Sequence, residues 1–174
     1  MLIINKKKYF NEIYTELFKK NMRAIDDMNN LLTYYGAKPH IEKDKYKFIL
    51  ATYLFNLFFL EGALQSKYLP QYQKEVSQII EASLSEIARR INYEQGKVFH
   101  AYLSVRKKLG DMALDDHFTD INPTYIASIW YLIFVFNEEY KPEELGYEAG
   151  EVETVISTAY HYLINDTVSY LDSL

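Results

Sequence analysis

The stretch YKFILATYLFNLFFLEGAL, residues 46–64, decides the fold class of this chain. Its apolar residues occupy nearly every face of a helix, which is typical of a helix surrounded by other helices. The apolar run at residues 48–60 is interrupted only by Thr52 and Asn56, and it is too short to span a bilayer. We therefore expect a buried helix at about residues 43–68, ended by Pro70.

A second apolar stretch, residues 126–136, predicts another enclosed helix at about residues 123–138. Asn122 and Pro123 form a typical helix start, because an Asn side chain accepts from a free backbone amide and Pro fits the first helical position. Apolar residues at three- and four-residue spacing predict amphipathic helices at about residues 9–35, 71–92, 94–109 and 151–171. Gly36 and Pro39 are expected to end the first of these. The prediction is an all-α, single-domain bundle of about six helices over residues 1–174, with helices 43–68 and 123–138 central.

The composition argues against several common kinds of site. The chain has no Cys, and no two of its four His residues lie four positions apart, so we do not expect a preformed zinc site. A Gly-rich phosphate loop, a nucleophile elbow and a dinucleotide motif are all absent. We therefore expect no cofactor. The lack of Cys and of a signal-peptide pattern favours a cytoplasmic protein without a membrane span.

The charges are unevenly distributed along the chain. Residues 1–110 contain 18 Lys and Arg against 11 Asp and Glu, whereas residues 111–174 contain 13 acids and one base, Lys141. The two parts carry formal charges of +7 and −12, which the net charge of −5 conceals. A concentration of one sign attracts partners of the opposite sign.

The acidic third predicts a surface that binds a basic protein partner. The carboxylates gather between helices 123–138 and 151–171, at Glu138, Glu139, Glu143, Glu144, Glu148, Glu151 and Glu153. Tyr140 and Tyr147 are predicted to be aromatic anchors there, and Asp115 and Asp116 belong to a second acidic cluster before Pro123. If the two helices are antiparallel, the two clusters lie at opposite ends of the pair. By analogy with immunity proteins, antitoxins and phage inhibitors, we expect a non-enzymatic, stoichiometric inhibitor.

Other interpretations stay open at this point. The acids could face the protein's own basic helices and solvent, where exposed pairs contribute roughly 0–1 kcal/mol each. A ligand pocket could lie between helices 43–68 and 123–138, near Tyr53, Asn56, Trp130 and Phe134. A metal-dependent hydrolase could use the oxygen ligands of residues 111–120, with Asp111, Asp115, Asp116, His117 and Asp120. Nucleic-acid binding is disfavoured because acids dilute the basic residues, and a homodimer is a further alternative.

Overall fold

The computed structural model describes residues 5–113 and 122–174. These residues form an all-α bundle whose helices share a common apolar core, and they contain no strand. The helices are α1 (Lys6–Tyr34), α2 (Lys38–Lys43), α3 (Lys45–Tyr68), α4 (Gln73–Arg90), α5 (Gln95–Ala113), α6 (Pro123–Phe136) and α7 (Glu151–Asp172), with the 3-10 turn η2 (Pro142–Leu145) before α7. The predicted all-α bundle is confirmed.

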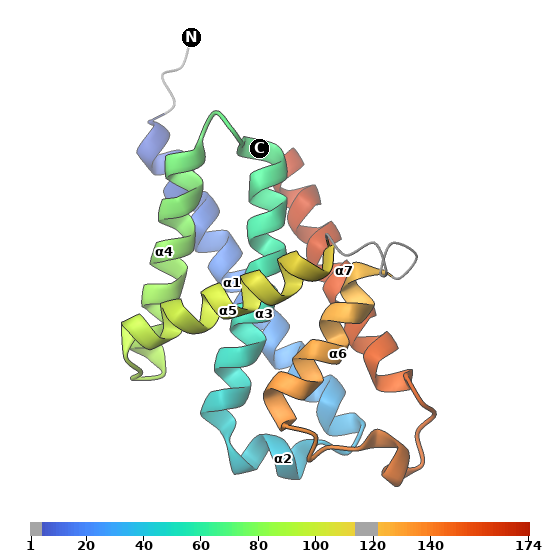
Figure 1. Cartoon of the computed structure of the whole chain (residues 1–174). Helices are drawn as coiled ribbons and strands as arrows, with labels where there is room; N and C mark the ends of the chain where they lie inside the picture. The colour runs from blue at the N-terminus through green and yellow to red at the C-terminus, as the bar shows by residue number, and fades with distance from the viewer. Residues whose placement is uncertain (1–4, 114–121) are drawn as a thin grey trace.

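Helix α3 is the centre of the bundle. It packs against α1, α4, α5, α6 and α7, and Figure 1 shows α5 crossing in front of it. Its buried residues lie on every side, and Tyr53, Leu54 and Leu64 are 0% exposed. This enclosure explains why the sequence of α3 lacks a polar face.

Helix α6 is less enclosed than its composition suggests. It packs on α3 and α7, but Ile129, Ile133 and Phe134 are 37%, 39% and 41% exposed. Trp130 lies under the ammonium group of Lys108, which is 3.7 Å from the ring centroid. The prediction of a central position therefore holds for α3, whereas α6 leaves one side open.

The helix ends follow the sequence signals, with one addition. Asn122 caps α6 by accepting a hydrogen bond from Thr124 N at 3.1 Å, as predicted. The short helix α2 is not among the predicted helices, because Pro39 is expected only to mark the end of the first helix. Proline is equally compatible with the first turn of a helix, where its missing N–H has no partner to lose, and it takes that position in α2.

Within the part of the chain that the structure describes, α3 is the one helix long and apolar enough to cross a membrane. Most of its apolar stretch is buried by the other helices of the bundle. A core helix of a soluble protein has these same properties.

Candidate functional site

Residues 138–153, called the acidic segment below, comprise the connection between α6 and α7, which includes η2, and the first turn of α7. Figure 1 shows this connection at the end of the bundle where α1 meets α2. The path is irregular: Asn137 and Glu138 have positive φ angles of 47° and 63°, and Gly146 and Gly150 adopt left-handed conformations. Such a path stays fixed only when contacts outside the segment hold it.

Two tyrosines provide these contacts. The hydroxyl of Tyr140 donates to the carbonyl oxygen of Tyr35 at 2.7 Å, and that of Tyr147 donates to the carbonyl oxygen of Tyr34 at 3.2 Å. The last carbonyls of an α-helix have no partner within the helix, so these bonds cap the C-terminal end of α1. The tyrosines thereby attach the acidic segment to α1.

This arrangement corrects the predicted role of Tyr140. Its side chain is 7% exposed and packs against Phe136 and His40, with ring centroids 5.1 and 5.7 Å away. Burial raises the pKa of the Tyr140 hydroxyl. Tyr140 is therefore part of the core and is not available as a surface anchor, whereas Tyr147 is half-buried.

Five of the seven carboxylates of the acidic segment are exposed, whereas Glu151 and Glu153 are partly buried and Glu151 accepts from the backbone N–H of Glu148 at 3.1 Å. Few of the seven meet a base. Glu139 pairs with Lys43 at 2.6 Å, and the pKa of its carboxyl is lowered by that contact. Glu144 pairs with Lys141 at 3.3 Å. In the described part of the chain no ion pair involves the other five, which are Glu138, Glu143, Glu148, Glu151 and Glu153. Pairing with the chain's own bases thus involves two of the seven carboxylates, and the interpretation in which the others face solvent stays an alternative.

An exposed aromatic residue that the sequence pattern did not single out lies beside the acidic segment. Tyr34 is 77% exposed, and its ring packs on Tyr35, whose own ring contacts Tyr147 at a centroid distance of 4.9 Å. Leu145 packs over Gly36 and is 55% exposed. Tyr34 falls one position before Tyr35 in the apolar stripe of α1, so the spacing could have predicted its exposure.

The second acidic cluster is only partly described. Asp115 and Asp116 lie outside the described residues, as do His117 and Asp120, while Asp111 is exposed on α5. Within residues 5–113 and 122–174, no three His, Asp or Glu side chains come together as a metal site would require. The hydrolase interpretation depends on residues outside these ranges.

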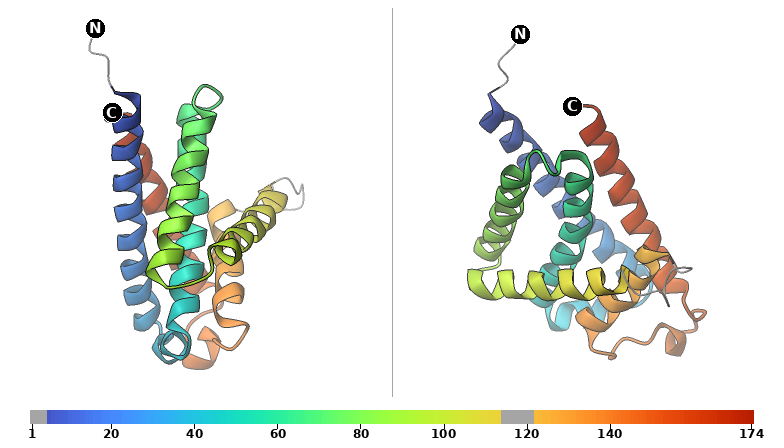
Figure 2. Two further views of the ribbon diagram at one scale, coloured as in Figure 1. Left: turned by 90° about the vertical axis from the view of Figure 1, so that its left-hand side faces the viewer. Right: turned by 45° about the horizontal axis from the view of Figure 1, so that its top comes forward.

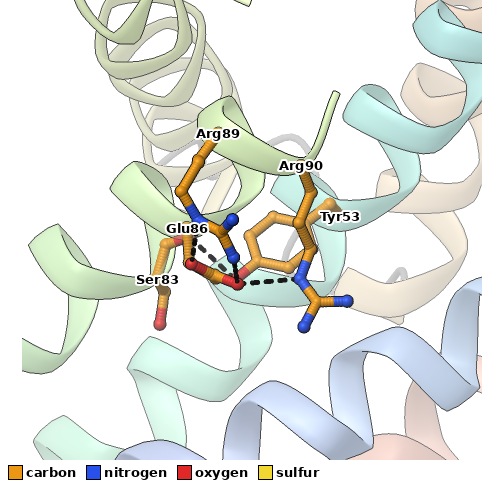
Figure 3. Close-up of polar contacts among 5 residues, drawn as sticks. All are labelled: Tyr53, Ser83, Glu86, Arg89 and Arg90. Carbon is orange, nitrogen blue, oxygen red and sulfur yellow. Dashed lines mark hydrogen bonds and ion pairs between the residues drawn. The ribbon is translucent and has the colours of Figure 1, made fainter. Parts of the chain in front are cut away.

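At the C-terminal end of α4, two arginines pair with a glutamate of the same helix. Figure 3 shows Arg89 and Arg90 both directed at Glu86. The Nη2 of Arg89 and the Nε of Arg90 lie 2.6 and 2.8 Å from Oε1 of Glu86. In the same view the hydroxyl of Tyr53 donates to the carbonyl oxygen of Ser83 at 3.0 Å. These guanidinium groups are therefore engaged within their own helix.

The Glu86 cluster predicts a stability effect that depends on pH. Contact with Arg89 and Arg90 lowers the pKa of Glu86 to about 2, from an ordinary value of 4.5. A lowered pKa stabilises the fold above the unfolded-state value, and this contribution disappears as pH falls from about 4.5 to about 2. We expect Glu86→Gln to lower the free energy of unfolding by about 1 kcal/mol at pH 7, since the arginines are largely solvated. Urea denaturation at pH 7 and pH 3 measures the free energy of unfolding of the variant and of the unchanged protein. The gap between the two free energies should be smaller at pH 3 than at pH 7. An equal gap at both pH values would contradict this assignment.

The cavity that the described residues form does not lie between α3 and α6, where the sequence predicts a pocket. The interface is filled by Phe55 and Tyr131, whose ring centroids are 5.4 Å apart, and by a 2.7 Å hydrogen bond between Thr52 and Tyr131. Tyr53 points toward α4 and Trp130 lies under Lys108. A cavity of about 640 Å³ opens instead between α1 and α7, and of the predicted residues only Asn56 lines it.

Fold and site together define a helical bundle with an ordered acidic connection at one end. Comparisons with protein-family models, with curated proteins and with solved structures gave no match to this chain. Its function is therefore inferred from the chemistry and geometry of its own residues.

Proposed function

We propose that this protein is a non-enzymatic interaction module, a stoichiometric inhibitor that binds a basic protein through the acidic segment. The observation that supports this most is the attachment by Tyr140 and Tyr147 to the end of α1. It orders the backbone while five of the seven carboxylates keep no ion pair within the described chain. A preformed surface loses less conformational entropy on binding than a flexible one.

The partner would present a positively charged face with a small apolar depression. Carboxylates on the acidic segment would accelerate encounter and fix orientation. Tyr34 and Leu145, 77% and 55% exposed, would supply the contact area that charge alone does not provide. By analogy, the targets of immunity proteins and antitoxins are often basic enzymes, so an immunity-like or antitoxin-like role in the cytoplasm of a bacterium or a phage-infected cell fits the surface.

A charge-reversal series tests this proposal. The test variant combines Glu143→Lys, Glu144→Lys and Glu148→Lys, and the control combines Glu12→Lys, Glu81→Lys and Glu94→Lys, which are exposed acids elsewhere on the bundle. Both variants change the net charge equally. Basic proteins captured by the unchanged protein at low salt are purified, and their association rates with all three forms are measured at low and high salt.

We expect the test variant to associate about 10- to 100-fold more slowly at low salt, because steering by the acidic field is lost. The control should slow association by less than about threefold, and high salt should bring all three rates together. If the test variant and the control slow association equally, net charge is responsible and the acidic segment is not the contact surface. If neither changes it, the proposal is wrong.

A further inference from the structure

A cavity of about 640 Å³ lies between α1 and α7, which pack side by side (Figure 2), and it reaches Asn56 on α3. Its volume falls within the range of small-molecule sites, about 300–1,000 Å³. The walls are mainly apolar and include Ala24, Met28, Leu31, Ala159 and Leu163. None of the residues that line it belongs to the acidic segment, so a ligand site in this cavity does not depend on the proposed function.

The inner end of the cavity has polar groups with hydrogen-bonding capacity left over. Asn56 is 1% exposed, and its amide nitrogen donates to Oδ1 of Asn21 at 3.0 Å. Asn21 in turn donates to the carbonyl oxygen of Tyr53 at 3.2 Å. An Asn side chain has two donor hydrogens and an oxygen that can accept two bonds. Among the described residues, the side chain of Asn56 makes only the bond to Asn21.

A second polar residue that lines the cavity, Tyr160, directs its hydroxyl into the core. Tyr160 is 1% exposed, and its hydroxyl has no hydrogen bond to any described residue. A buried polar group without a partner costs about 1–3 kcal/mol, so such groups are uncommon unless something else satisfies them. The hydroxyl of Tyr160 is buried among core rings and does not face the cavity, so Asn56 alone indicates a ligand that carries a hydrogen-bonding group at its inner end.

The mouth of the cavity carries both signs of charge. Lys20 and Asp166 pair across it at 2.5 Å and connect α1 to α7. Arg23 and Asp27 lie one helical turn apart on α1, line the same mouth, are exposed, and take part in no ion pair within the described ranges. Tyr162 adds an aromatic ring that is 72% exposed.

We propose that this cavity binds a small zwitterionic aromatic ligand. The ring occupies the apolar walls, and a polar ring atom bonds with Asn56. The anionic group of the ligand lies near Arg23 and its ammonium group near Asp27, so a molecule with only one of these charges leaves one of the two side chains unmatched.

Three indole compounds test the proposal, because they share one ring and one N–H donor but differ in head-group charge. They are L-tryptophan, which is zwitterionic, tryptamine, which is cationic, and indole-3-propionate, which is anionic. Each is titrated into the ¹⁵N-labelled protein up to about 10 mM while amide shifts are followed by NMR. We expect L-tryptophan to shift the amides that flank the cavity on α1 and α7, and to bind about fivefold more tightly than either singly charged compound.

Variants assign the head-group contacts without disturbing the core. Arg23→Gln should weaken indole-3-propionate and L-tryptophan but not tryptamine, and Asp27→Asn should weaken tryptamine and L-tryptophan but not indole-3-propionate. Lys107→Gln, an exposed site on α5, is the matched control and should change nothing. The proposal is overturned if L-tryptophan shifts no amide around the cavity, or if the three compounds bind equally.

Discussion

Replacing Glu61 by alanine is expected to lower the free energy of unfolding by about 3–4 kcal/mol. Glu61 lies on α3, is 7% exposed, and both of its carboxylate oxygens are occupied. Oε2 accepts from the hydroxyl of Tyr102 and lies 3.3 Å from Nε of Arg106, while Oε1 accepts from Gln65 at 2.9 Å. Removing the carboxylate leaves the hydroxyl of Tyr102, a residue 2% exposed, without its acceptor.

The source of this loss can be separated by a double-mutant cycle in chemical denaturation. Tyr102→Phe alone should cost about 1–2 kcal/mol, because Glu61 keeps its other two partners. The double variant should cost less than the sum of the single variants, since it removes the orphaned hydroxyl together with its acceptor. Glu81→Ala, an exposed site on α4, serves as the control and should stay within about 0.5 kcal/mol. Simple additivity would show that the hydrogen bond between Glu61 and Tyr102 does not cause the loss.

Much of the fold could be predicted because its signals are local. The apolar run of α3 is apparent from residues 46–64 alone. Asn122 and Pro123 mark the start of α6, and the contacts by which they do so lie within one helical turn. The position of Pro39 shows the limit of such reasoning, because a proline fits both the end of one helix and the first turn of the next. Only the packing of α2 against α1 and α3 distinguishes the two.

The candidate sites could be predicted less well, since they depend on contacts between distant residues. Charge counting locates the acidic segment, but Tyr140 turns inward to a carbonyl 105 positions away, which no pattern within residues 138–153 reveals. Asn56 is recognisable as a polar residue on an apolar helix, yet the cavity beside it is formed by α1 and α7. The pairing of these helices follows from tertiary packing and not from the period of either one.

The different positions of α3 and α6 in the bundle lead to the other large expected effect. Leu54→Ala should lower the free energy of unfolding by about 3–5 kcal/mol, because Leu54 is 0% exposed at the centre of α3. Packed side chains surround this site, so the bundle can only partly close the space left by the missing methyl groups. Ile133→Ala on α6, where the side chain is 39% exposed, should cost about 1 kcal/mol or less.

The comparison of these two variants is informative because both helices are apolar all round in sequence. Composition alone predicts similar losses for the two substitutions, whereas the observed packing predicts a difference of at least about 2 kcal/mol. Urea denaturation measures both changes, and similar slopes in the two variants would establish that the unfolded states are comparable. Equal losses would mean that Ile133 is covered in solution, by a second copy of the chain or by another partner, and a loss that falls with protein dilution would identify the second copy.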